Sequence, residues 1–132
     1  MKLLLDTNIF LEIILDQEKA EEAKGLLLKA GKYDFFIFDY SLHSIGLLLF
    51  RKNKHVMFQQ FIQDVLLSGS VGMLSLTARE MNDVILAAQK FGLDFDDAYQ
   101  YTIAANSQAE LVSFDNDFFR TDIKLRKPME IS

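Results

Sequence analysis

The chain has 132 residues, half of them hydrophobic, and a formal net charge of −5; this length supplies one domain with one core. It contains no cysteine, which excludes disulfides and thiolate metal sites and fits the reducing cytoplasm, where we expect the protein to act. No apolar run approaches the ~20 residues that a membrane helix needs, so we expect no membrane partner. The acidic balance argues against a protein that coats nucleic acid.

The first apolar run predicts a buried strand at residues 2–5 that ends abruptly at Asp6. A helix follows at once, over residues 9–15, and Thr7 or Asn8 is placed to cap it. Asp6 has two interpretations. It caps this helix, or it stands where α/β proteins bind ligands, at the carboxyl end of a strand.

Apolar patterns of strand and helix type alternate along the rest of the chain. Asp39 stands at the tip of the second strand, Thr77 and Glu80 form a capping-box pattern, and Asp115 ends the fourth strand. The further predicted strands are 35–38, 72–76, 110–114 and a short one at 129–131, and the further helices are 18–30, 40–50, 55–67, one ending at 91, and 94–107. This order predicts an α/β fold: a three-layer α/β/α sandwich with a central, mainly parallel sheet of four to five strands, in a single domain over residues 1–132.

Three acids are predicted to meet at one edge of this sheet. Asp6 and Asp115 follow the first and fourth strands, and Asp97 lies in the first turn of a helix. Converging carboxylates raise one another's pKa unless a cation neutralises them, and oxygen ligands suit Mg²⁺ or Mn²⁺. Taken singly, each acid also has a structural explanation: a helix cap for Asp6, the helix dipole for Asp97 and an ordinary turn for Asp115.

Residues 3–8, Leu-Leu-Leu-Asp-Thr-Asn, resemble the opening motif of the PIN-domain family, which includes the VapC-type toxins of toxin–antitoxin pairs. Asp97-Ala98 is similar to the family's later Asp-Ala at a helix start, and residues 111–118 are similar to its closing strand and Asp-x-Asp-Phe turn. Within these motifs Thr7 and Ser113 take auxiliary positions, and Ser113 stands where the family often has Thr. The resemblance covers essentially the whole chain.

This resemblance implies a Mg²⁺- or Mn²⁺-dependent endoribonuclease that hydrolyses RNA phosphodiesters, as the toxin of a toxin–antitoxin pair. It implies that Asp6, Asp97 and Asp115 are catalytic metal ligands. Asp117 matches a further catalytic acid that tunes the ion or orients water. A homodimer and a small antitoxin partner are also implied.

The chain departs from the family on the helix after the second strand, where a Glu is expected near Ser44 and none occurs. Losing one acid weakens cation binding and disfavours a site with two metal ions. Asp39 is an auxiliary candidate that substitutes for this acid, unless it is the N-cap of a helix beginning near Ser41. His43 and Ser44 are candidates for holding a water molecule or a phosphate, unless His43 is packed or capping. The alternative function is a non-catalytic or weakly active PIN-fold module that binds RNA or a protein partner.

Basic and aromatic residues near the acids suggest how RNA is held. Arg120 and Lys124 follow the closing motif and are candidates for RNA binding through phosphate contacts, with solvated loop charge as the other interpretation. Tyr99 and Tyr101 are placed either to stack on a base or to pack in the core.

The stretch from Leu47 to Phe61 has more apolar residues than one helical stripe needs. A helix that is hydrophobic around most of its surface must be covered. We expect a second copy of the chain or an antitoxin helix to cover it.

Overall fold

A computed structural model of the chain describes residues 1–116, 118 and 120–132. These residues build a five-stranded parallel sheet in the order β3-β2-β1-β4-β5. The strands are β1 (Lys2–Leu5), β2 (Asp34–Phe38), β3 (Val71–Leu74), β4 (Glu110–Val112) and β5 (Leu125–Arg126). The predicted α/β fold with a parallel central sheet is confirmed.

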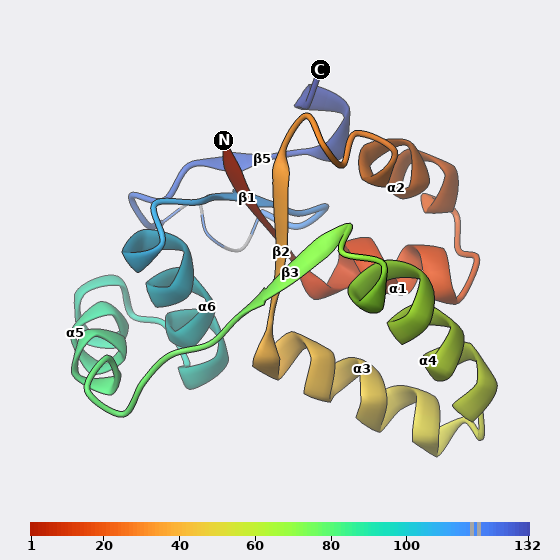
Figure 1. The fold of residues 1–132 in the computed structure, drawn as a ribbon. Coiled ribbons are helices and arrows are strands. Elements are labelled where there is room, and N and C mark those ends of the chain that lie inside the picture. Colours follow the sequence, from red (N-terminus) through yellow and green to blue (C-terminus); the bar gives the residue numbers. More distant parts are fainter. Residues whose placement is uncertain (117, 119) are drawn as a thin grey trace.

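Helices cover both faces of this sheet, which gives the predicted three layers. Figure 1 shows α1 to α4 on one side of the sheet and α5 and α6 on the other. The helices are α1 (Thr7–Ile14), α2 (Ala20–Leu27), α3 (Asp39–Arg51), α4 (His55–Phe61), α5 (Met81–Phe91) and α6 (Phe95–Asn106), with a π-helical turn η1 (Ile62–Leu67) after α4 and a 3₁₀ turn η2 (Pro128–Glu130) near the C-terminus.

The leucines of β1 explain why this strand is central. Leu3, Leu4 and Leu5 are fully buried, as expected for a parallel strand with helices on both faces. Successive side chains of a strand point to opposite faces. Leu3 and Leu5 therefore join the core beneath α1 to α4, while Leu4 joins the core beneath α5 and α6.

The order of the strands creates a crevice beside β1. The chain first runs outward from β1 to β2 and β3, and later returns to add β4 and β5 on the other side. Ligands bind at such a switch point, outside the carboxyl ends of the strands. Leu5 pairs with Val112, and the Asp6 amide donates to the Val112 carbonyl at 2.9 Å. Asp6 and the residues after β4 therefore meet at the switch point.

Two predicted element ends are corrected. The fifth strand is Leu125–Arg126, and residues 128–130 form η2 instead of the strand predicted at 129–131, because Pro128 lacks the amide proton that a strand needs and suits the first turn of a helix. The helix predicted over 55–67 changes to π geometry at Ile62.

The helix caps also differ from the prediction. Asp6 is the N-cap of α1, where its side chain accepts from the Thr7 amide, so neither Thr7 nor Asn8 has the predicted capping role. Helix α3 begins at Asp39 with Phe38 at the N-cap, so Asp39 is not the N-cap. Gly92 ends α5 with a φ of 66°, a left-handed conformation that glycine adopts without strain.

None of the helices in the described residues is long and apolar enough to cross a membrane.

Candidate active site

Asp6 is both a helix cap and a member of a polar cluster. Its Oδ1 accepts from the Thr7 amide at 2.7 Å, which satisfies one of the free N–H groups at the start of α1. Its Oδ2 accepts from the Ser113 hydroxyl, also at 2.7 Å. The capping interpretation therefore holds for one carboxylate oxygen, while the other faces the end of β4.

Asn8 ties the start of α1 to the loop after β4. Its side-chain amide donates to Ser113 Oγ at 3.0 Å and to Asp115 Oδ2 at 3.1 Å. The Phe114 amide donates back to Asn8 Oδ1 at 3.3 Å, and the Asp115 amide donates to Ser113 Oγ at 3.0 Å. These bonds hold the carboxylates of Asp6 and Asp115 on the same side of the sheet.

The carboxylates of Asp6 and Asp115 lie close together in surroundings that favour the binding of a positive charge. Burial raises the pKa of Asp6, and the nearby Asp115 carboxylate raises it further, against the lowering effect of hydrogen bonds from Ser113 and Thr7 and of the nearby Gln100 amide. The ion pairs formed within the described residues all lie elsewhere. A cation beside Asp6 would stabilise its charged form.

Asp97 lies in the first turn of α6. Asp94 is the N-cap of this helix and accepts from the Asp97 amide at 2.9 Å. Asp97 lies three residues before Gln100, on the same face of the helix, and the Gln100 amide is near enough to Asp6 to lower its pKa.

The acids do not form a complete set of metal ligands in the described residues. Within the described residues, no three His, Asp or Glu side chains lie close enough together to hold a metal ion as they stand. The predicted acid Asp117 lies outside the described residues. The structure therefore brings Asp6 and Asp115 together and leaves Asp97 on the facing helix.

The position of the absent glutamate is occupied by neutral groups. Ser44 is exposed on α3, and one turn earlier the buried Ser41 shares a 2.7 Å hydrogen bond with Thr7. A cavity of about 140 Å³ is lined by Thr7, Ser41, Ser44 and Gln100, together with Phe38, Tyr40 and Asp96. Beside Asp96, this corner offers the hydroxyls of Thr7, Ser41 and Ser44 and the amide of Gln100.

Asp39 has a structural partner. Both of its oxygens accept from the Tyr99 hydroxyl, at 3.0 and 3.1 Å, and Oδ1 also accepts from the Tyr40 amide at 3.0 Å. Burial raises the pKa of Tyr99 to about 12, and the Asp39 carboxylate adds to the effect. The phenol therefore stays a donor to Asp39 at neutral pH.

His43 is exposed on α3, so the packed interpretation of this residue is wrong. It lines a cavity of about 650 Å³ together with Asp39, Tyr40, Ser44 and Asp96. This hollow shares Tyr40, Ser44 and Asp96 with the smaller cavity above, so the two form a continuous recess at the carboxyl edge of the sheet.

Aromatic rings line the mouth of this recess. Tyr99 is buried, and Tyr40 stacks on it with ring centres 4.1 Å apart. Tyr40 and Phe95, with ring centres 5.9 Å apart, are 38% and 52% exposed. Of the two interpretations offered for Tyr99 and Tyr101, core packing is confirmed for Tyr99, and Tyr101 donates to Asp122.

The basic residues after β4 have mixed surroundings. Arg120 is exposed. Lys124 lies 3.4 Å from Glu110, and Arg126 lies 2.7 Å from it. Lys127 donates to the carbonyls of residues 114 and 115, at 2.8 and 3.2 Å, and so supports the loop that carries Asp115.

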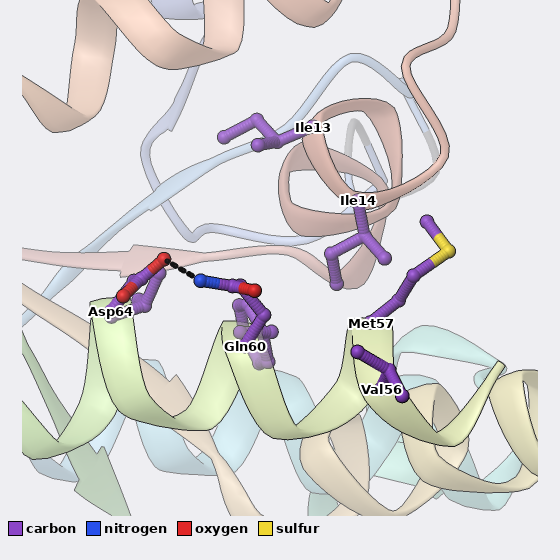
Figure 2. Close-up of a pocket in the computed structure, with 8 residues that line it drawn as sticks. Ile13, Ile14, Val56, Met57, Gln60 and Asp64 are labelled. Carbon is purple, nitrogen blue, oxygen red and sulfur yellow. Dashed lines mark hydrogen bonds between the residues drawn. The ribbon is translucent and has the colours of Figure 1, made fainter.

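Two apolar hollows lie away from the acids. The first, of about 310 Å³, lies between α1 and α4. Figure 2 shows Ile13 and Ile14 of α1 facing Val56 and Met57 of α4, with the Gln60–Asp64 hydrogen bond at one end. The second, of about 480 Å³, is lined in part by Leu47, Phe50 and Phe58 of α3 and α4.

Asn8, Gln100 and Tyr40 are the site residues that the sequence did not indicate. Asn8 lies within the Asp-Thr-Asn motif, which was the available signal. Gln100 is a polar residue on a helix face otherwise occupied by Ala98, Tyr99 and Ile103, and the burial of that face is visible only in the fold.

Known proteins with this architecture support the comparison of motifs. The chain resembles VapBC2 from Rickettsia felis bound to a DNA fragment from their promoter, with 18% identity, a TM-score of 0.76 and coverage of 96% of this chain and 98% of that chain. It resembles a toxin–antitoxin complex from Klebsiella pneumoniae, with 16% identity, a TM-score of 0.74 and coverage of 96% and 97%. It also resembles VapC20 from Mycobacterium tuberculosis, a toxin that cleaves the sarcin–ricin loop, with 17% identity, a TM-score of 0.72 and coverage of 92% and 95%.

At these identities the solved structures establish the fold, and the curated proteins include no match. The family model for the PIN domain matches residues 3–124. That span includes strands β2, β3 and β4, all of β1 but its first residue, and the polar cluster around Asp6 and Asp115. The chain therefore belongs to the PIN domain family.

Proposed function

We propose that the protein is a metal-dependent endoribonuclease that hydrolyses RNA phosphodiesters in the cytoplasm, as the toxin of a toxin–antitoxin pair. The observation that carries this proposal is the pair of carboxylates, Asp6 and Asp115, held together at the switch point of the sheet by Asn8 and Ser113. Burial and the neighbouring acid raise the pKa of Asp6, which is the arrangement that a cation relieves.

The donor set fits Mg²⁺ or Mn²⁺, because it consists of carboxylate oxygens and contains no thiolate. Asp6, Asp115 and Asp97 would hold the ion, and Asp117 would be the auxiliary acid. When bound, such an ion activates water and stabilises charge on a phosphodiester. Ser113 fixes the orientation of Asp6, and Thr7 connects that corner to Ser41 of α3.

The surroundings of the acids suit a single RNA strand. Tyr40 and Phe95 expose ring faces at the mouth of the recess, and exposed rings stack on bases of any identity. Arg120 is exposed and would contact backbone phosphates, whereas Lys124 pairs with Glu110 at the start of β4, away from the acids. His43 and Ser44 line the recess.

The apolar hollow between α1 and α4 is the proposed binding site for an antitoxin helix. A similar structure is a toxin–antitoxin complex, and a groove lined by Ile13, Ile14, Val56 and Met57 (Figure 2) suits the apolar face of an amphipathic helix. Val56→Glu would place a charge in this groove. We expect it to abolish co-purification with the product of an adjacent small open reading frame, and unchanged co-purification would contradict the assignment.

The second hollow is the proposed homodimer surface. Leu47 and Phe50 are 45% and 56% exposed on α3, and burying them against a second copy removes apolar surface from water. We expect Leu47→Glu to convert a dimer into a monomer in sedimentation experiments. A wild-type monomer at high concentration would contradict this part of the proposal.

Cleavage of RNA tests the proposed activity. The wild-type protein should cleave single-stranded RNA in Mn²⁺, and EDTA should stop the reaction. Asp97→Asn should lower the rate at least about 100-fold, since even outer-shell partners of a metal cost 10–100-fold. Asp34→Asn is the matched control, because Asp34 is exposed at the opposite end of the sheet.

The alternative function is an RNA-binding or protein-binding module without catalysis. It is favoured by one observation: neutral Ser44 and Ser41 occupy the corner where a further acid is expected. RNA binding that survives EDTA, without any cleavage after long incubation in Mn²⁺, would establish the alternative and exclude the nuclease.

A further inference from the structure

Gln100 is a buried amide with an unmet hydrogen bond. Its side chain is 5% exposed, and its Nε2 makes no hydrogen bond of ordinary geometry with any residue that the structure describes. Gln100 lines the small cavity that it shares with Thr7 and Ser41. Burying an amide donor without a partner destabilises a protein, and such a group calls for a functional explanation.

An apolar side chain at residue 100 of α6 would avoid the destabilisation caused by the unpaired amide. The helix face around it consists of Ala98, Tyr99, Thr102 and Ile103, and the Thr102 hydroxyl is satisfied by the Ala98 carbonyl at 2.8 Å. A methionine or leucine at residue 100 would pack here without any polar group. The amide therefore suits an acceptor that arrives from outside the protein.

The small cavity beside Gln100 defines the chemistry of that acceptor. It is lined by Thr7, Ser41 and Ser44 and has a volume of about 140 Å³, space for a few groups of the size of water. Because Thr7 and Ser41 share one hydrogen bond, one of their two protons remains to be donated into the cavity. An amide N–H and a hydroxyl proton attract an oxygen that accepts hydrogen bonds.

A phosphodiester has such oxygens. The acids at the neighbouring corner cannot donate to a phosphate, whereas the Gln100 amide and the hydroxyl can. The small cavity also adjoins the larger recess, with which it shares Tyr40, Ser44 and Asp96. A strand that lies along the recess can therefore place one phosphate oxygen into the cavity.

We propose that Gln100 is a positioning residue that donates from Nε2 to a non-bridging phosphate oxygen of bound RNA, in the neutral corner where the family's usual glutamate is absent. This inference rests on the proposed RNA-binding function. It assigns the corner around Ser41 and Ser44 to the substrate and leaves the cation to the acids Asp6, Asp97 and Asp115.

The test compares Gln100→Met with the wild-type protein in two measurements. Methionine keeps the length of the side chain and removes the donor. The affinity for a short fluorescein-labelled oligouridine, measured in Ca²⁺ by fluorescence polarisation, should fall about tenfold or more, as expected for a lost hydrogen bond to a charged group. The melting temperature without RNA should rise by about 3 °C or more, because the unpaired donor is gone.

The opposite changes in affinity and stability separate this role from a structural one. Gln100→Glu replaces the donor by an acceptor of the same shape and should weaken RNA binding at least as much as methionine does. Gln89→Met is the control, since Gln89 is exposed on α5, and it should change neither quantity.

Each other outcome contradicts the inference in a recognisable way. Unchanged RNA affinity in Gln100→Met, with normal binding by the wild type, would overturn the role of Gln100 and leave the proposed function intact. A lower melting temperature would overturn it too, because the amide would then have a partner within the fold. Failure of the wild-type protein to bind RNA would overturn the proposed function together with this inference.

Discussion

Two carboxylates at opposite ends of the same strand pair are treated in opposite ways. Glu110 lies at the start of β4 beside Leu3, and Asp6 lies just past the end of β1 beside Ser113. Burial alone would raise the pKa of Glu110, but Arg126 and Lys124 outweigh burial and lower it. Burial raises the pKa of Asp6, and Asp115 adds to the effect.

Glu110 and Asp6 differ in the charge of the groups that donate to them. Arg126 donates twice to Glu110, at 2.7 and 3.3 Å, so the protein supplies its own positive charge and ties β5 to β4. Among the described residues, Asp6 receives neutral donors from Thr7, Asn8 and Ser113 and faces a second acid. The proposed cation from solution would supply the positive charge that Asp6 lacks among these residues.

A lysine beside Asp6 should give this carboxylate the positive partner that Glu110 already has. Asn8→Lys places an ammonium group between Asp6 and Asp115, where the Asn8 amide now lies 3.1 Å from Asp115 Oδ2. Opposite charges about 4 Å apart in a partly buried site interact by about 4 kcal/mol, so Mn²⁺ affinity should fall at least about 100-fold. Calorimetric titration measures this effect, with Asn82→Lys on the exposed face of α5 as the control; an unchanged affinity would place the cation elsewhere.

Adding an acid to the neutral corner should sharpen the contrast. Ser44→Glu restores a carboxylate at the edge of the recess and should raise Mn²⁺ affinity roughly tenfold by Coulomb attraction. The same carboxylate would repel a phosphate in this corner, so RNA affinity should fall while Mn²⁺ affinity rises. A variant with weaker Mn²⁺ binding would show that residue 44 does not face the ion.

Removing the positive charge at the other end should have the smallest effect. Arg126→Gln should lower the free energy of unfolding by about 1 kcal/mol at neutral pH, because the pair is only partly buried. The pKa of Glu110 is lowered from 4.5, so its contribution is present above that value and is lost as the pH falls through the lowered pKa. Urea unfolding of wild type and variant should therefore converge in acid, and a difference that persists there would contradict an electrostatic origin.

Most of the fold was predictable because its signals are local. The leucines of β1 and Gly92 each act within a few residues of the chain. The reciprocal Thr77–Glu80 bonds form as predicted, but they close a turn before α5, which begins at Met81. The strand at 129–131 was wrong because β5 has only two residues, too few for a period to appear. The change of α4 to a π-helical turn at Ile62 left no mark in the apolar pattern.

The site was predictable where it follows from strand ends and not where it depends on packing. Asp6 and Asp115 come together because β1 and β4 are neighbours in a parallel sheet. Gln100 and Tyr40 reach the same corner through the angle at which α6 and α3 pack, and their roles depend on burial. Tyr99 was left with two interpretations, and only the fold shows that its ring lies in the core and donates to Asp39.

The central claim is that the Asp6 end of the sheet binds a divalent cation, and a titration with Mn²⁺ tests it most directly. Wild type should bind Mn²⁺ measurably, and Asp6→Asn should weaken binding at least about tenfold. The pKa of Asp6 is raised above its ordinary 3.8, so its charge costs stability as the pH rises through the raised value. Asp6→Asn should therefore melt no lower than wild type in EDTA at neutral pH. Identical titration curves for the two proteins would contradict the account.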